Sequence, residues 1–123
     1  MTDESLLDRI ATREATIGVV GLGYVGLPLS LSFDEAGFEV RGFDIDDYRM
    51  AEIEAGSSYV DDVSDERLST ALERGFVAST DEVVVEDCDV YVIAVPTGMH
   101  DGEPDMSAVE AAAKTVADRS GER

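Results

Sequence analysis

The chain has 123 residues, a length that fits one domain with a hydrophobic core but is short for an oxidoreductase that binds two substrates. Its 28 acidic and 9 basic residues give a formal net charge of -19 at pH 7, which argues against nucleic acid or an anionic membrane as a partner. An apolar fraction of 44% argues against disorder and, with that charge, favours a halophilic protein over a generically acidic one.

Residues 1–14 predict a separate amphipathic helix. Leu6, Leu7 and Ile10 share one helical face, with charged side chains around them. We expect this helix to pack on the domain or on a partner subunit. The charged start has no secretory-signal pattern and no apolar run approaches membrane-spanning length, so we expect a cytoplasmic protein without a membrane anchor.

The next stretch predicts a buried strand, a glycine turn and the start of a helix. Residues 16–20 are mostly β-branched and apolar, and Gly21, Gly23 and Gly26 follow with the spacing G-x-G-x-x-G. Gly21 permits the tight turn, Gly23 permits a pyrophosphate to approach, and Gly26 permits the helix to lie against the sheet. Because a helix start also offers free N–H groups to an anion, the stretch predicts a dinucleotide site.

A second strand, expected over 39–43, brings an acidic residue to the same edge of the sheet. Asp44 follows it, close to the spacing of about 20 residues at which dinucleotide-binding proteins place the carboxylate that binds the adenosine ribose. A carboxylate there would repel a 2′-phosphate, which favours NAD over NADP. The alternative, that Asp44 caps the next helix, is weaker because Asp46 and Asp47 are better placed for capping.

The middle of the chain predicts shorter elements. They are a helix over 47–55, a loop over 57–63, a helix from Ser64, which caps it, to Gly75, and a strand over 76–79. Residues 80–86 fit either one helical turn capped by Thr80 or a strand through Val83, Val84 and Val85.

A further buried strand is expected over 88–95, ended by Pro96 because proline cannot donate to a sheet. Cys88, the only cysteine, lies between two aspartates whose charges disfavour a thiolate, so we interpret it as a packing residue. His100 has no second histidine or cysteine to form a metal site with, and we expect no metal.

The end of the chain predicts a loop over 97–104 and a last helix. Ser107 and Glu110 have capping-box spacing. Small apolar residues predict the packing face of this helix, namely Ala108, Val109, Ala112, Ala113, Val116 and Ala117.

The alternation of strands and helices predicts one α/β domain of the Rossmann type with a doubly wound parallel sheet. Ligands of such sheets bind beyond the carboxyl ends of the strands, which gathers Gly21 to Gly26, Asp44 and Val95 to Gly98 at one edge.

Three segments carry a family resemblance: GLGYVGLPLSLSFDEAGFEVRGFDID from Gly21, CDVYVIAVPT from Cys88 and EPDMSAVEAAA from Glu103. They resemble the amino-terminal, NAD-binding domain of the UDP-glucose/GDP-mannose dehydrogenase family. The resemblance covers nearly the whole chain from Glu14 and implies an NAD-binding domain over 15–123. GSSYVDDV, from Gly56, is similar to members that oxidise UDP-N-acetylhexosamines.

Family members oxidise C6 of a nucleotide sugar from alcohol to acid, with two NAD and a cysteine thiohemiacetal. The resemblance implies that the pyrophosphate is held by Gly21, Gly23, Tyr24, Val25 and Gly26, the adenosine by Asp44 and Arg49, and the nicotinamide side by Val95, Pro96 and Thr97. Arg49 as a solvated helix charge and Tyr24 as a simple lid for the turn remain alternatives.

The chain also departs from the family. Gly98 stands where members usually have the second proline of Pro-Thr-Pro, which loosens that loop. The family's nucleophilic cysteine and its accompanying lysine belong to a carboxyl-terminal region without a counterpart here, so we expect no catalytic residue in this chain. The resemblance thus implies a truncated NAD-binding part of a UDP-sugar 6-dehydrogenase, inactive alone. The UDP-sugar would be bound mainly by the missing part, and the full-length protein would be a homodimer or higher oligomer.

Two alternatives stay open. A stand-alone NAD-sensing module would need a natural stop codon after Arg123. A dehydrogenase of the hydroxyacid or 6-phosphogluconate type shares the glycine turn, but does not usually combine Gly-Tyr-Val-Gly, Val-Pro-Thr and Glu-Pro-Asp.

Overall fold

The computed structural model describes residues 5–96 and 98–121. Its main sheet is parallel, with the strand order β3-β2-β1-β4. The strands are β1 (Thr16–Val20), β2 (Glu39–Phe43), β3 (Val77–Ser79) and β4 (Val90–Ile93). The chain places β2 and then β3 on one side of β1 and then returns to place β4 on the other. This confirms the Rossmann-type doubly wound α/β sheet and puts the topological switch point between β1 and β4.

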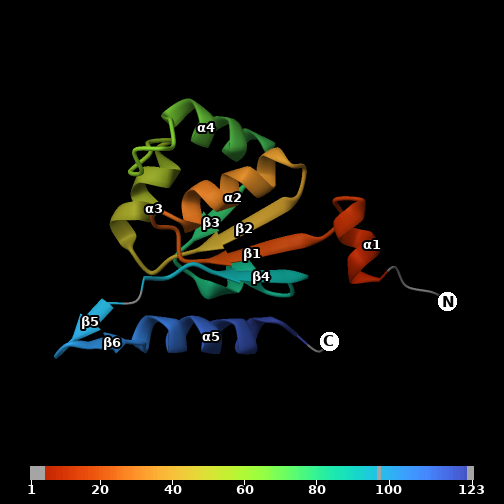
Figure 1. Ribbon diagram of the computed structural model, residues 1–123. Coiled ribbons are helices and arrows are strands. Elements are labelled where there is room, and N and C mark those ends of the chain that lie inside the picture. Colours follow the sequence, from red (N-terminus) through yellow and green to blue (C-terminus); the bar gives the residue numbers. More distant parts are fainter. Residues whose placement is uncertain (1–4, 97, 122–123) are drawn as a thin grey trace.

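Helices cover both faces of this sheet (Figure 1). In chain order the helices are α1 (Leu6–Ala11), α2 (Gly26–Glu35), α3 (Asp47–Glu54), α4 (Asp65–Arg74), the 3-10 helix η1 (Glu82–Val85) and α5 (Ser107–Arg119). Of these, α1 lies beyond the end of the sheet at which β1 begins and covers neither face (Figure 1). The expected cap of α4 is confirmed, since Ser64 Oγ accepts from the Arg67 N–H at 3.0 Å. Asp46 caps α3 in the same way, at 3.1 Å from the Arg49 N–H.

The two faces of β1 contribute to two hydrophobic clusters. Ile17 and Val19 point to the face covered by α2, α3 and α4, while Val20 points to the face covered by η1 and α5. Alternation of side chains along a strand separates them, and burial of both faces explains the unbroken apolar sequence. Cys88 is buried in the second cluster, next to Gly18.

The strand expected over 88–95 is shorter and less buried than its sequence indicates. β4 covers only Val90–Ile93, and Ile93 is 41% exposed. Within the described residues β4 is an edge strand that pairs with β1 alone, so one edge and part of its surface stay uncovered. Residues 80–86 were expected to form either a helical turn or a strand, and residues 82–85 form a 3-10 helical turn. Its cap is Asp81 rather than Thr80, because the Asp81 carboxylate reaches the Val83 N–H.

The expectation of a loop over 97–104 is wrong. β5 (Gly98–His100) and β6 (Glu103–Asp105) form a hairpin that extends away from the main sheet (Figure 1). Asp101 and Gly102 both have positive φ, 53° and 80°, as a two-residue type I′ turn requires. The Asp-Gly pair was the signal in the sequence for this hairpin.

The start and packing face of α5 also differ from expectation. Ser107 is the first residue of the helix and not its cap, Met106 at the cap position makes no side-chain capping bond, and the Asp105 carboxylate accepts from the Ser107 N–H at 2.9 Å. This bond holds the pKa of Asp105 below its ordinary value. Ala112 and Thr115 are buried against the sheet, whereas Ala113 and Ala117 lie outside the buried stripe and are exposed.

The helix expected over 1–14 exists as α1, but its apolar face does not pack on the domain. Leu6, Leu7 and Ile10 are 48%, 76% and 37% exposed. Arginines anchor α1 instead: Arg9 pairs with Asp89 at 3.0 Å, and Arg13 donates to a carbonyl at the end of α2. In the described part of the chain, no helix is long and apolar enough to cross a membrane.

Candidate functional site

The glycine turn lies at the switch point, where β1 meets α2. Gly21 has φ +100°, and a Cβ there would lie 2.7 Å from the Ala94 carbonyl oxygen. A Cβ at Gly26 would collide with the Gly21 carbonyl, so this glycine permits close approach of backbone to backbone. A Cβ at Gly23 would meet only the Arg49 guanidinium, at 3.5 Å. Gly21 and Gly26 are therefore required by the turn itself, whereas a Cβ at Gly23 would make only ordinary van der Waals contact, with the Arg49 guanidinium.

The turn presents unpaired donors at the start of α2. The N–H groups of Gly23, Tyr24 and Val25 have no hydrogen-bond partner among the described residues. The side chains of Tyr24 and Val25 are 78% and 66% exposed. These residues can therefore serve an anion through their backbone, reinforced by the positive end of the helix dipole.

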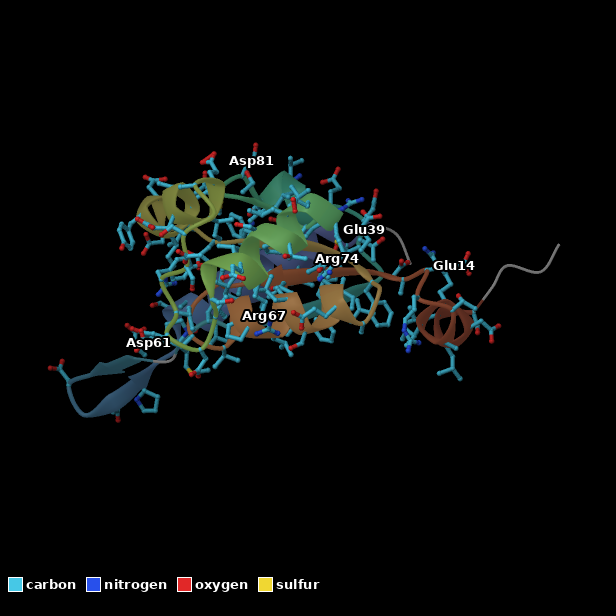
Figure 2. All side chains as sticks on the ribbon, turned by 90° about the horizontal axis from the view of Figure 1, so that it is seen from above. Glu14, Glu39, Asp61, Arg67, Arg74 and Asp81 are labelled. Carbon is cyan, nitrogen blue, oxygen red and sulfur yellow. The ribbon has the colours of Figure 1, made fainter. Side chains whose placement is uncertain are left out.

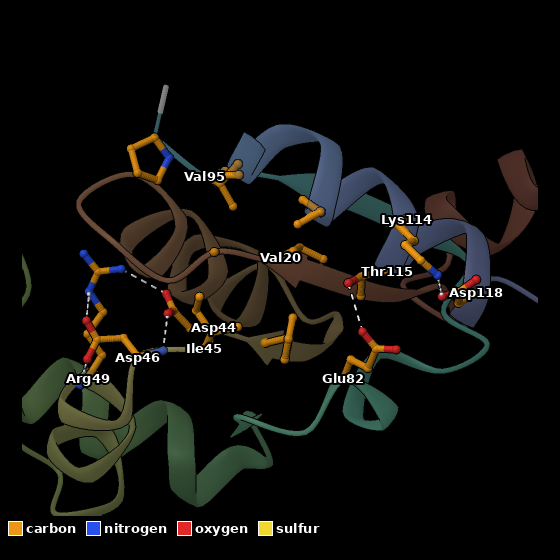
Figure 3. A pocket seen from close by; sticks show the side chains of 17 residues that line it. Val20, Asp44, Ile45, Asp46, Arg49, Glu82, Val95, Lys114, Thr115 and Asp118 are labelled. Carbon is orange, nitrogen blue, oxygen red and sulfur yellow. Dashed lines mark hydrogen bonds and ion pairs between the residues drawn. The ribbon is translucent and has the colours of Figure 1, made fainter. Parts of the chain in front are cut away.

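Asp44 ties this turn to the end of β2. Its side chain is buried and already accepts three hydrogen bonds, from the Leu22 N–H at 2.8 Å, the Asp46 N–H at 2.8 Å and Arg49 Nη1 at 3.0 Å. Figure 3 shows Asp44 and Arg49 facing each other at the pocket. The alternative of Arg49 as a solvated helix charge is wrong, since its side chain is 29% exposed and paired with Asp44.

Sequence reasoning missed Tyr59. Its hydroxyl donates to the Leu22 carbonyl at 2.6 Å, and its ring centroid lies 6.0 Å from the Arg49 guanidinium carbon. Tyr59 belongs to the stretch between α3 and α4, which has little periodicity, predicts a loop and carries a family resemblance that gives Tyr59 no role. No sequence pattern joins it to a turn 37 residues away.

A pocket of about 610 Å³ lies beside the turn, between the carboxyl ends of the strands and α5 (Figure 3). Its walls are mainly apolar and include Val20, Phe43, Ile45, Val95, Ala108 and Ala112. Ala108 and Ala112, which were expected in the packing face of the last helix, thus line one wall of a cavity. Small side chains on α5 leave this space open.

The two ends of the pocket are polar. Asp44, Asp46 and Arg49 line the end near the turn. Glu82, Lys114, Thr115 and Asp118 line the other, where Thr115 donates to Glu82 at 3.0 Å and Lys114 to Asp118 at 3.0 Å. The bond to Asp118 raises the pKa of Lys114. The sequence had no signal for this second end, which forms by packing of α5 against η1.

The structure brings most of the expected site residues together. Gly21, Asp44, Arg49, Val95 and Pro96 all line the pocket. Gly23, Tyr24, Val25 and Gly26 lie in the turn next to it, and Thr97 is outside the described residues. Among the described residues, no group of three or more histidine, cysteine, aspartate or glutamate side chains could hold a metal ion.

Known proteins match this chain in sequence and in structure. A model of the UDP-glucose/GDP-mannose dehydrogenase family, NAD binding domain, matches residues 15–123. UDP-N-acetyl-D-mannosamine dehydrogenase of Escherichia coli K12 is 42% identical over 108 residues, which are 84% of this chain and 24% of that protein. NDP-N-acetyl-D-galactosaminuronic acid dehydrogenase of Ralstonia nicotianae is 38% identical over 104 residues, 83% of this chain and 24% of that protein.

Solved structures agree. UDP-D-ManNAc dehydrogenase from Pyrococcus horikoshii superposes with a TM-score of 0.79 at 32% identity, covering 85% of this chain and 25% of that one. The chain thus spans about a quarter of the length of the relatives it matches. With the family model matching nearly its whole length, the chain belongs to the UDP-glucose/GDP-mannose dehydrogenase family as its NAD-binding domain.

Proposed function

We propose that this chain is the NAD-binding part of a UDP-sugar 6-dehydrogenase, and that the sugar is a UDP-N-acetylhexosamine. The observation that carries the proposal is the glycine turn, whose unpaired N–H groups open beside a pocket bounded by Asp44 and Arg49. The relatives named as UDP-N-acetyl-D-mannosamine dehydrogenases support the choice of sugar.

The residues fit the parts of NAD. The pyrophosphate would lie over Gly23 and accept from the N–H groups of Gly23, Tyr24 and Val25, with the Arg49 guanidinium supplying a positive charge nearby. The adenosine would enter the pocket, whose volume of about 610 Å³ and apolar walls suit a nucleoside. Bound NAD supplies a hydride acceptor; the chain's own residues hold and orient it.

Asp44 would select NAD over NADP. A carboxylate has about four acceptor positions, and three are occupied, which leaves room for one ribose hydroxyl. A 2′-phosphate would be repelled by the negative charge of the Asp44 carboxylate, which has no hydrogen to donate to it. Val95 and Pro96 line this pocket too, so they would contact the adenosine, and with Thr97 they would form the edge toward the nicotinamide.

The remaining assignments complete the proposal. Residues 15–123 would form the NAD-binding unit and α1 a separate element. The UDP-sugar and the catalytic thiol would be contributed mainly by protein outside these residues. The working enzyme would be a homodimer or higher oligomer in a salt-rich cytoplasm.

Calorimetric titration of the 123-residue chain with NAD and with NADP, followed by an assay with UDP-N-acetylmannosamine, tests the proposal. We expect saturable binding of NAD, weaker binding of NADP and no NADH formation. Binding of NADP in preference to NAD would contradict the cofactor assignment. Oxidation of the sugar by this chain alone would contradict the proposal that the catalytic thiol lies outside it.

A further inference from the structure

The peptide groups around Leu22, between the first two glycines of the turn, are fixed from three directions. The Leu22 side chain is fully buried and lies so close to β2 that a Cβ at Gly42 would be 2.9 Å from it. Its N–H donates to Asp44, and its carbonyl accepts from the Tyr59 hydroxyl. Two of these constraints come from β2 and the residue after it, but the third comes from a loop far away in the chain.

The Tyr59 hydroxyl is a firm donor to this carbonyl. A tyrosine hydroxyl is protonated near neutral pH, and burial and then the nearby Asp44 charge raise the pKa of Tyr59 further. The ring is half-buried and lies within cation–π range of Arg49, which in turn binds Asp44. Tyr59, Arg49 and Asp44 thus form a continuous set of contacts around the Leu22 backbone.

This contact acts on the donors that face the proposed pyrophosphate. Leu22 precedes α2, which begins at Gly26, so its carbonyl lies outside the helix and accepts from Tyr59. The Gly26 N–H has no partner among the described residues, as is usual in the first turn of a helix. Fixing the Leu22 carbonyl also fixes the peptide plane that contains the N–H of Gly23. The turn therefore presents the Gly23 N–H, the first of these donors, in one orientation before any ligand arrives.

We infer that Tyr59 is a positioning residue that preorganises the glycine turn for the pyrophosphate of NAD, acting through the Leu22 carbonyl. The inference rests on the proposed NAD binding and adds a residue from outside the glycine turn to that site. Tyr59 itself does not line the pocket.

The test is Tyr59→Phe, which keeps the ring against Arg49 and removes only the hydroxyl. Tyr91→Phe is the matched control, because the Tyr91 hydroxyl also bonds to backbone, at Val85 and Arg119, away from the turn. Each chain is titrated calorimetrically with NAD and with AMP, which has the adenosine and one phosphate but no pyrophosphate. We expect Tyr59→Phe to weaken NAD binding about three- to tenfold, the effect of one hydrogen bond, and to leave AMP binding within about twofold. Tyr91→Phe should leave both affinities unchanged.

A second readout needs no ligand. Amide hydrogen exchange of the free chain should quicken in Tyr59→Phe at the two bonded amides of the turn, Leu22, which donates to Asp44, and Leu27, which donates to the Gly23 carbonyl, with the amides of β1 unchanged. Wild-type affinity for NAD in Tyr59→Phe, or equal losses for NAD and AMP, would overturn the positioning role. If the wild-type chain does not bind NAD, the proposed function and this inference both fail. If the wild-type chain binds NAD and Tyr59→Phe binds it equally well, only this inference fails.

Discussion

Asp44 has two tasks at the scale of a single residue. It holds the glycine turn through the Leu22 N–H, and it faces the pocket where a ribose would lie. The hydrogen bond to Leu22 is visible only in the structure. The spacing between the glycine turn and Asp44 predicts a contact with the ribose but no contact with Leu22.

Asp44→Ala should therefore affect both binding and stability. We expect NAD binding to weaken about tenfold or more, with less discrimination against NADP, because the ribose partner and the local negative charge are lost. Stability should fall by about 1–3 kcal/mol, since the Leu22 N–H loses its partner inside the fold. Calorimetry and thermal melts measure the two effects.

Asp34→Ala is the matched control for this variant. Asp34 is an equally buried carboxylate, paired with Arg74 at 2.6 Å between α2 and α4, and lies outside the pocket. It should lose stability without losing NAD affinity. Unchanged affinity for both cofactors in Asp44→Ala would remove Asp44 from the site.

Gly23→Val should abolish NAD binding and leave the fold intact. The added side chain would stand over the turn, where the atoms nearest to its Cβ belong to the Arg49 guanidinium, at ordinary contact distances of 3.5 and 3.6 Å. Gly26→Ala gives the contrast, because its Cβ would collide with the Gly21 carbonyl and should lower the melting temperature. Loss of folding in Gly23→Val would show that this glycine is structural.

At the scale of elements, sequence signals within a few residues predicted the helices, strands and caps that depend on those residues alone. The β1, turn and α2 unit, the bounds of β2 and the Ser64 cap all follow from spacing, β-branching and capping within a few residues. The Asp-Gly pair is a local signal for the hairpin of β5 and β6, although a loop was expected over 97–104. The contact of Tyr59 with Leu22 and the polar end of the pocket at Glu82 could not be predicted, because they join segments far apart in the chain through packing.

The α4 cap provides a prediction at this scale. Ser64→Ala removes the acceptor for the Arg67 N–H and should lower the free energy of unfolding by about 1 kcal/mol. NAD affinity should not change, since α4 lies on the face of the sheet away from the pocket (Figure 1). Urea unfolding measures the first quantity. An unaltered midpoint would mean that the cap contributes nothing to stability.

At the scale of the whole molecule, the charge of -19 is the dominant feature. Acidic side chains such as Glu14, Glu39, Asp61 and Asp81 surround the fold (Figure 2). Most of the arginines in the described part of the chain already pair with carboxylates, so they offset only the charges beside them. The excess of acidic over basic residues makes them repel one another most strongly in dilute buffer.

The melting temperature should therefore rise steeply with KCl. Screening shortens the Debye length from about 10 Å at 0.1 M to about 3 Å at 1 M, which removes most of this repulsion in the folded state. Thermal melts monitored by circular dichroism across that range measure the effect. A melting temperature independent of KCl would contradict the halophilic interpretation of the composition.

Amide NMR during an NAD titration shows whether NAD binds at the glycine turn of this chain. We predict saturable shifts concentrated at Gly23, Tyr24, Val25 and Gly26, with smaller ones along the pocket at Asp44 and Ala112. Saturable shifts confined to another part of the molecule, or no saturable shifts at all, would contradict the account.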